Sequence, residues 1–243
     1  MRFNNDEGDV SMSFFLSEPD KPASTVAILL HEGMTASDAT GPYEALRSIP
    51  GATVKFVAEV PGPKRMDSGF LTLVADYGLE EVPHPDILVV CPGSPAVLPS
   101  ERLLSWIRTA HETSQWTASV CAGSLLLGAA GVLQGVRATT IWPVMEMLPQ
   151  FGAIACPGER YVRDGKIITS AGNSAGIDMA LYLVGQIAGA EIAEATQLLM
   201  EYDPQPPFDS GSLAKASPRV IELAQGFLQN WFADATAKYG QQV

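Results

Sequence analysis

The stretch that decides the fold is Trp116-Thr-Ala-Ser-Val-Cys-Ala-Gly-Ser-Leu-Leu-Leu-Gly-Ala-Ala-Gly131. A β-type run from Thr117 to Val120 stops at Cys121, and small residues followed by a helical apolar pattern come directly after it. This order is typical of a strand, a sharp turn and a helix that together hold a nucleophile at the carboxyl edge of a parallel sheet. The positive end of the helix and its unpaired N–H groups are expected to lower the pKa of the Cys121 thiol.

Apolar runs and helical patterns alternate along the rest of the chain, which predicts an α/β fold with a mostly parallel sheet covered by helices on both faces. Strands are expected over residues 25–30, 53–58, 71–75, 87–91, 117–120, 137–140, 160–163 and 167–170. Helices are expected after Cys121 and over residues 42–47, 101–111, 175–187, 191–201 and 218–232. Thr40-Gly41-Pro42 is the expected start of the first helix, and Asp164-Gly165 the expected turn between the last two strands.

Length and composition indicate one sizeable globular domain. The chain has 243 residues, of which 47% are hydrophobic and 17% charged. We expect a single domain over residues 24–243, preceded by a flexible, acidic extension over residues 1–23. The net charge is −12 and no Lys/Arg cluster occurs, so no nucleic-acid partner is expected. The apolar runs are too short to cross a bilayer and no signal core precedes them, so we expect a cytoplasmic protein without a membrane partner.

Cysteine and histidine are few and scattered. The three cysteines are odd in number and include no C-x-x-C pair, which argues against a disulfide framework and a thiolate zinc site. Histidine occurs at three positions without H-E-x-x-H spacing, namely His31, His84 and His111. A metal centre is therefore not expected. Cys91, inside an apolar run, is interpreted as inert core, and Cys156, beside a Pro-Gly pair, as incidental.

Three segments are expected to meet at Cys121, because ligands of open α/β sheets sit at the carboxyl ends of the strands. They are residues 31–42 after the first strand, the Cys-Pro-Gly-Ser-Pro run at residues 91–95, and the elbow itself. The backbone N–H groups of Gly93, Ser94 and Ala122 are candidates for binding a developing anion. The alternative for Gly93 and Ser94 is an ordinary turn at a strand exit.

Asp38 and Glu32 are the acidic candidates in the first of these segments. A carboxylate beside a thiol can carry a proton to and from the reacting group. For Asp38 the alternative role is capping of the helix expected to follow it, and for Glu32 it is a solvated loop position. Ile141, Trp142 and Met145 are candidates for apolar pocket walls or for packing a dimer seam.

Several motifs resemble a known family. The run from Val120 to Thr140, with Cys-Ala-Gly-Ser-Leu-Leu-Leu-Gly at its start, resembles the nucleophile segment of the ThiJ/PfpI superfamily, whose members are class-I glutamine-amidotransferase-like proteins. Ser37-Asp-Ala-Thr-Gly-Pro42 and Glu201-Tyr-Asp-Pro-Gln-Pro-Pro-Phe-Asp-Ser-Gly211 resemble the isocyanide hydratase branch of that superfamily. The similarity covers residues 25–215.

The resemblance implies a flavodoxin-like three-layer sandwich and a homodimer with a cofactor-free active site between its subunits. It implies Cys121 as the nucleophile and Asp38 as its carboxylate partner. Two positions depart from the family pattern. Ala122 stands where a threonine often follows the cysteine, and Ile141 stands where many members have a histidine. No histidine follows Cys121, so a Cys–His dyad would need a histidine from upstream.

The missing histidine favours hydration of an organic isocyanide, R–N≡C, over the peptidase, glutaminase and glyoxalase activities of the superfamily. In this interpretation the Cys121 thiolate attacks the terminal carbon while Asp38 handles the proton, which gives a covalent thioimidate. Water then releases the N-substituted formamide, while the N–H groups of Gly93, Ser94 and Ala122 orient the intermediate.

Two alternative functions stay open from the sequence. One is a non-catalytic stress protein whose Cys121 is oxidised as a signal. The other is the sensor domain of an AraC-type transcription regulator. For that second function, residues 210–243 are expected to be too short and too acidic for a DNA-binding module.

Overall fold

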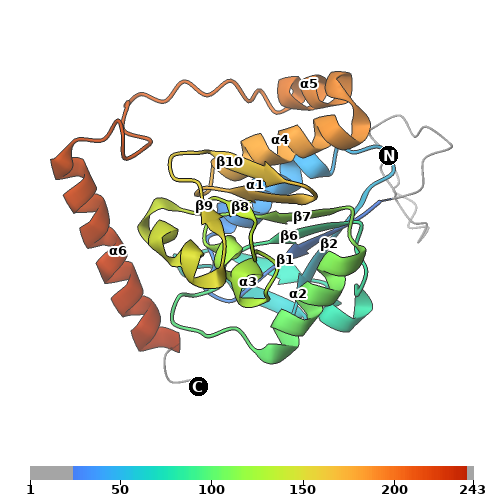
Figure 1. Ribbon diagram of the computed structural model, residues 1–243, viewed down its shortest axis with the longest axis horizontal. Coiled ribbons are helices and arrows are strands. Elements are labelled where there is room, and N and C mark those ends of the chain that lie inside the picture. The colour runs from blue at the N-terminus through green and yellow to red at the C-terminus, as the bar shows by residue number, and fades with distance from the viewer. Residues whose placement is uncertain (1–23, 240–243) are drawn as a thin grey trace, which may run out of the picture.

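A seven-stranded sheet forms the centre of the protein (Figure 1). The computed structural model describes residues 24–239, so the extension expected over residues 1–23 lies outside the described residues. The strands follow the order β10-β11-β7-β6-β1-β2-β5, and all neighbouring pairs are parallel except β10 with β11. The predicted α/β fold with a mostly parallel central sheet, of the flavodoxin-like kind, is confirmed.

Most strands of this sheet lie close to their expected positions, but β5 is not among the expected strands, and the strand expected over residues 71–75 is β4, which pairs outside the sheet. The strands of the sheet are β1 Thr25–Leu29, β2 Thr53–Ala58, β5 Tyr77–Gly78, β6 Ile87–Val90, β7 Trp116–Ser119, β10 Tyr161–Asp164 and β11 Ile167–Ser170. A turn at Gly165 joins β10 and β11 into the predicted antiparallel hairpin. Two small pairs lie outside the sheet: β3 Gly62–Arg65 with β4 Thr72–Ala75, and β8 Arg137–Ala138 with β9 Ile154–Ala155.

Helices cover both faces of the sheet (Figure 1). They are α1 Ala36–Leu46, α2 Glu101–Thr113, α3 Gly123–Ala129, α4 Ala175–Ala188, α5 Ala190–Leu199 and α6 Pro218–Tyr239, with 3-10 segments η1 Leu79–Glu81 and η2 Trp142–Phe151. Val26 and Ile28 of β1 belong to the core under α1 and α4, whereas Ala27 and Leu29 belong to the core under α2 and α3. This alternation is what a strand buried on both faces requires. No helix within residues 24–239 combines the length and apolar character needed to cross a membrane.

The first helix begins earlier than predicted. The expected start at Thr40-Gly41-Pro42 is wrong, because α1 begins at Ala36 and Pro42 lies inside it. A proline inside a helix has no N–H for the carbonyl four residues before it, which here is that of Asp38. The Cys91 thiol donates to this carbonyl instead, with 3.3 Å between Sγ and O. The helix therefore tolerates Pro42 because a side chain from the end of β6 supplies the missing donor.

The strand expected over residues 137–140 is largely wrong, because β8 covers only Arg137–Ala138 and pairs outside the main sheet. The two threonines that follow bond to other segments. The Thr139 N–H donates to Oγ1 of Thr169, and Oγ1 of Thr140 donates to the Cys121 carbonyl at 2.9 Å. Hydrogen bonds that involve a threonine side chain of β11 and the elbow thus take the place of a ladder at these residues.

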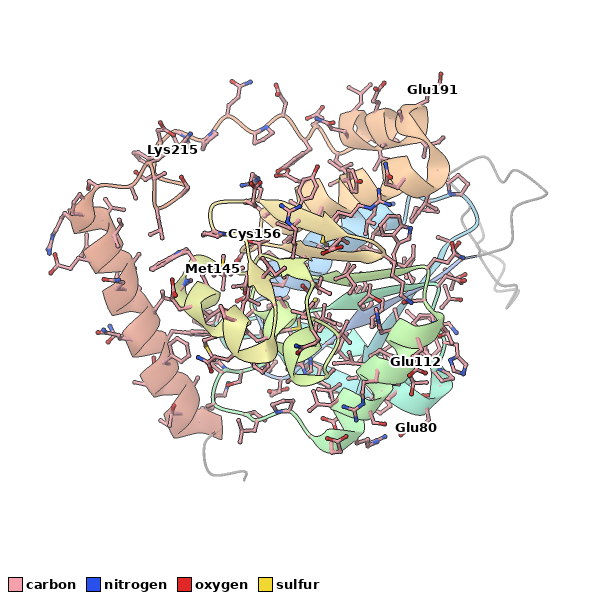
Figure 2. The ribbon with its side chains drawn as sticks, in the orientation of Figure 1. Glu80, Glu112, Met145, Cys156, Glu191 and Lys215 are labelled. Carbon is pink, nitrogen blue, oxygen red and sulfur yellow. The ribbon has the colours of Figure 1, made fainter. Side chains whose placement is uncertain are left out.

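The C-terminal part departs from the compact body. Residues 203–217 form an exposed arm that leads from α5 to α6, and α6 stands beside the body on the side of β8 and β9 (Figure 1). The hydroxyl of Tyr202 anchors the start of the arm by donating to Oδ1 of Asp178 at 2.6 Å. Figure 2 shows Lys215 on the arm, outside the body, and Met145 on the side of the body that faces α6.

Candidate active site

Cys121 lies at a strained turn between β7 and α3. Its backbone φ is 57°, in the left-handed region that non-glycine residues rarely adopt. Such strain costs on the order of 1–3 kcal/mol and persists only where the surroundings hold it. The Cys121 N–H donates to the Ala171 carbonyl at 3.0 Å, and the Gly123 N–H donates to the Val120 carbonyl at 2.8 Å. The predicted nucleophile elbow is therefore present in the backbone.

Small residues after Cys121 are required by the neighbouring strand. A Cβ on Gly123 would lie 2.1 Å from the Val90 carbonyl oxygen, which is closer than any side chain can approach. Only glycine therefore allows α3 to begin this close to the end of β6. The position of the sulfur depends on this close packing of two strand ends.

Asp38 lies in the first turn of α1 and is fully buried. Neither carboxylate oxygen has a hydrogen-bond partner of standard geometry among the described residues, so the capping role weighed for Asp38 is not what its carboxylate does. Burial raises the pKa of Asp38 to about 7, and the negative charge of Asp67 adds to this. The Cys121 thiol and the Asn173 backbone oppose the rise in that pKa, which makes both groups neighbours of the carboxyl.

The expected lowering of the Cys121 pKa is wrong. Burial of the sulfur raises its pKa well above that of an ordinary thiol, and the nearby Asp38 charge raises it further. The backbone N–H groups of Ala122 and Asn173 act in the opposite direction but do not outweigh these two causes. The resting site therefore holds a protonated thiol beside a carboxyl whose pKa is about 7. A standing thiolate is therefore not the resting form of Cys121.

A cavity of about 650 Å³ opens at the elbow. Its lining includes Cys121 and the four residues predicted to contact substrate, namely Gly93, Ser94, Ala122 and Ile141. Trp142 and Met145 are not among the lining residues, whereas Pro143, Val144 and Met147 of η2 are. The side chain of Asp38 is buried beside the sulfur and does not line the cavity.

Ser94, predicted to donate its N–H to an anion, and Glu32, the second acid candidate, are both engaged in hydrogen bonds between loops. The Ser94 N–H donates to the Glu32 carbonyl at 3.2 Å, so it is not free to bind an intermediate as predicted. The exposed Glu32 carboxylate accepts the Arg65 N–H at 3.0 Å, which makes it a loop-holding residue. Of the N–H donors considered, that of Ala122 acts at the sulfur.

The histidines do not supply a partner for Cys121. His84 and His111 bond to Thr113 and Thr117, at the opposite ends of the strands from the elbow. Burial lowers the pKa of His31 to about 4, so its ring is neutral, and its buried Nε2 has no hydrogen-bond partner within residues 24–239. His31 is not among the groups that act on the Cys121 pKa. Within residues 24–239, no three His, Cys, Asp or Glu side chains gather as a metal site.

Asn173, Asp67 and helix α6 contribute to the site, although none of them is identified from the sequence. Asn173 follows β11 with φ of 35°, its backbone acts on both Cys121 and Asp38, and its Nδ2 donates to Ser37 Oγ at 2.9 Å. Its position after a strand next to β7 is a signal that could have identified it. Asp67, from the β3–β4 hairpin, and three residues of α6 also line the cavity, and no local pattern marks them.

Comparison with known proteins places the chain among relatives of this architecture. The model of the DJ-1/PfpI family matches residues 24–186. The chain belongs to the DJ-1/PfpI family. It is 41% identical to isonitrile hydratase of Pseudomonas putida over 206 residues, which are 84% of this chain and 89% of that protein. The chain is 32% identical to a ThiJ/PfpI family protein from Pseudomonas syringae, and the TM-score with the crystal structure of that protein is 0.81. The match covers 97% of this chain and 96% of that one.

The family also includes relatives with other functions. The chain is 31% identical to the HTH-type transcriptional regulator CdhR of Pseudomonas aeruginosa over 134 residues, which are 54% of this chain and 40% of that protein. The predicted membership of the ThiJ/PfpI superfamily is confirmed by the family match and the first two relatives. Membership alone does not decide between an enzyme and a regulator.

Proposed function

We propose that this protein hydrates an organic isocyanide to the N-substituted formamide, as a hydro-lyase acting through Cys121 and Asp38. The observation that carries the proposal is a buried thiol–carboxyl pair at the wall of an apolar cavity, with no histidine acting on the sulfur. The 41% identity to isonitrile hydratase supports it.

The reaction can proceed with one proton held between the two groups. Asp38 takes the proton of the Cys121 thiol, the sulfur bonds to the terminal carbon of R–N≡C, and the proton passes to that carbon. The product of this step is the thioimidate R–N=CH–S–Cys. Water then adds across the C=N bond, its oxygen to carbon and a proton to nitrogen. Collapse of this adduct breaks the C–S bond, returns a proton to sulfur and releases R–NH–CHO.

The raised pKa values fit this chemistry. A thiol with an ionised carboxylate, and a thiolate with a protonated carboxyl, carry the same net charge, so the proton transfer adds no net charge to a buried site. A pKa of about 7 lets Asp38 act both as base and as acid near neutral pH. The Ala122 N–H, which lowers the pKa of the sulfur, stabilises it in the ionised form.

The two departures from the family pattern tune the site rather than remove its chemistry. Ala122 lacks the hydroxyl of a threonine but keeps the N–H that acts at the sulfur. Ile141 places an apolar side chain in the cavity wall where a histidine would place a titrating ring. Hydration through Cys121 and Asp38 needs neither the hydroxyl nor the ring.

The test is conversion of an alkyl isocyanide to its formamide, followed by ¹³C NMR with the isocyanide carbon labelled. We expect the wild-type chain to form the formamide and Asp38→Asn to form none at a detectable rate. A mass increase equal to the isocyanide on the peptide that contains Cys121 would identify the covalent intermediate. Full turnover by Cys121→Ser, or no formamide from any isocyanide tried, would contradict the proposal.

The alternative functions have less support from the site. Oxidation as a signal requires thiolate character, and burial and Asp38 raise the pKa of Cys121. For a transcription regulator the sequence likeness is lower than for the hydratase, since the chain is 31% identical to CdhR over 54% of its own length. The homodimer with a site between subunits and the cytoplasmic location stay predictions. Sedimentation velocity measures the first of these directly.

A further inference from the structure

The C-terminal helix α6 contributes apolar side chains to the cavity that holds Cys121. Leu228, Trp231 and Phe232 line this cavity, although they lie more than a hundred residues from the elbow in the sequence. Residues of α6 that are buried or half-buried recur at helical spacing, as Ile221, Ala224, Leu228, Trp231 and Ala235. The remaining face is open to solvent, with Phe227 71% exposed. One side of α6 is thus directed at the body and at the cavity.

Among the described residues, the side-chain bonds of residues 209–222 stay within the arm and the start of α6. Lys215 pairs with Asp209 at 2.6 Å within the arm, and Arg219 pairs with Glu222 at 2.7 Å within α6. Ser217 Oγ accepts the Val220 N–H at 3.4 Å at the junction of arm and helix. The side chains that α6 places in the cavity lining are mainly apolar, which favours selection of partners by size and shape.

The cavity lining combines a few polar side chains with a larger number of apolar ones. The polar ones are Thr35 before α1, Ser94 and Asn173 after strands of the main sheet, and Asp67 between β3 and β4. Its apolar side chains come mainly from α3, η2 and α6. A molecule whose reacting carbon contacts Cys121 can pack its remaining atoms on apolar surface to which α6 contributes. The volume of about 650 Å³ lies within the range of sites that enclose whole small molecules.

We propose that α6 is the specificity-determining wall of this cavity. In this assignment Trp231, Leu228 and Phe232 pack on the apolar group of the substrate while Cys121 acts on its reacting carbon. The assignment rests on the proposed function for the identity of that carbon. It goes beyond it in giving substrate selection to a helix that stands outside the body.

The first test compares a bulky with a small isocyanide on the full-length chain. For Trp231→Ala we expect kcat/KM for benzyl isocyanide to fall about tenfold, mainly through KM, and that for methyl isocyanide to stay within about twofold, because only the larger group reaches α6. Phe227→Ala is the matched control, since it removes an aromatic ring from the exposed face of the same helix. It should change neither value.

A second test measures size selection by the α6 wall through alkylation of Cys121, without hydratase turnover. The rate at which Cys121 adds to N-benzylmaleimide relative to N-methylmaleimide is followed by intact mass, in a Cys156→Ser background that removes a half-exposed thiol. We expect Trp231→Ala to lower this ratio about tenfold and Phe227→Ala to leave it unchanged. Cys121→Ala gives the background rate.

The two tests separate the wall from the hydratase. A changed maleimide ratio with no formamide from any variant supports the wall and contradicts the proposed function. Formamide production with unchanged ratios in both assays overturns the wall and leaves the function standing. Leu228→Ala repeats the measurement with a smaller change, and far-UV circular dichroism confirms that α6 remains folded. Equal loss on large and small probes in a folded Leu228→Ala chain also overturns the assignment.

Discussion

The carboxyl ends of β6 and β7 lie side by side, and each is followed closely by a buried cysteine with a different role. Burial first, and then the charge of Asp38, raises the pKa of both thiols. Cys91 is fully buried and donates to the Asp38 backbone carbonyl, whereas Cys121 is 8% exposed and lines the cavity. Ionisation at rest therefore does not separate the two thiols. Access and the strained backbone at Cys121 do.

The largest difference between the two strand ends is expected in catalysis. Cys121→Ala removes the nucleophile and should lower kcat for formamide formation by at least about a thousandfold. Cys91→Ala should leave kcat within about fivefold and lower the free energy of unfolding by about 1–2 kcal/mol, because the Asp38 carbonyl loses its donor. Formamide assays and urea unfolding measure the two effects. A Cys91→Ala chain that is folded but inactive would show that the two sulfurs share the chemistry.

The second difference concerns the carboxylate that serves Cys121. Below pH 3.8 Asp38 is protonated in both states, and between pH 3.8 and about 7 the native state holds a proton that the unfolded state has lost. The stability contributed by this group therefore decreases as the pH rises through that window. Asp38→Asn removes this dependence and should raise the free energy of unfolding at pH 8 by up to about 4 kcal/mol relative to wild type.

Urea unfolding of wild type and Asp38→Asn at pH 4 and pH 8 measures this gain. The difference between the two chains should be larger at pH 8, while the variant produces no formamide. An equal difference at both pH values would show that Asp38 is not held with a raised pKa.

The third prediction tests the contact that joins the two strand ends. Gly123→Ala places a Cβ 2.1 Å from the Val90 carbonyl oxygen, so either the elbow or β6 must shift. We expect the free energy of unfolding to fall by about 3 kcal/mol. The control is Gly226→Ala in α6, where a Cβ meets nothing within 4 Å and alanine favours the helix. Unfolding in denaturant compares them, and equal stabilities would contradict the close packing at the elbow.

The contrast between the two cysteines also separates what the sequence reveals from what it conceals. Local patterns predict six of the seven strands of the main sheet, the elbow at Cys121 and the convergence of loops at one edge, because strands and helices leave a periodic trace in the sequence. The pKa of Cys121 was predicted in the wrong direction. The helix end can be read locally, but burial and the approach of Asp38 from another segment depend on packing.

Other parts of the site left no local trace. The predicted start of α1 is wrong because the helix accommodates Pro42 through a hydrogen bond from Cys91 to the Asp38 carbonyl, and Cys91 is far away in the sequence. The occupied Ser94 N–H depends in the same way on its contact with the Glu32 carbonyl. Asp67 reaches the cavity from a hairpin outside the main sheet, and Trp231 reaches it from α6. The packing of distant segments sets these contacts, and periodicity records only neighbours along the chain.

The smallest expected effect concerns Asp67. It distinguishes the Asp38 carboxylate, which is proposed to serve Cys121, from the Asp38 carbonyl, which accepts a hydrogen bond from the Cys91 thiol. The Asp67 carboxylate accepts the Thr35 hydroxyl at 2.6 Å and the Ser68 N–H at 2.7 Å, and its charge raises the pKa of Asp38. Asp67→Asn removes the charge and keeps the shape, so the pKa of Asp38 should fall. If ionised Asp38 accepts the Cys121 proton, the acidic limb of the kcat/KM profile then moves to lower pH.

The shift should largely persist at high salt, because Asp38 is fully buried and salt screens buried charges only weakly. Asp76→Asn is the control, since Asp76 is exposed and does not line the cavity. Cys91 contacts the Asp38 carbonyl and not its carboxylate, so Asp67→Asn should leave the stability effect of Cys91→Ala unchanged. A profile that stays in place, or moves to higher pH, would show that the charge of Asp67 does not act on the carboxylate that serves Cys121.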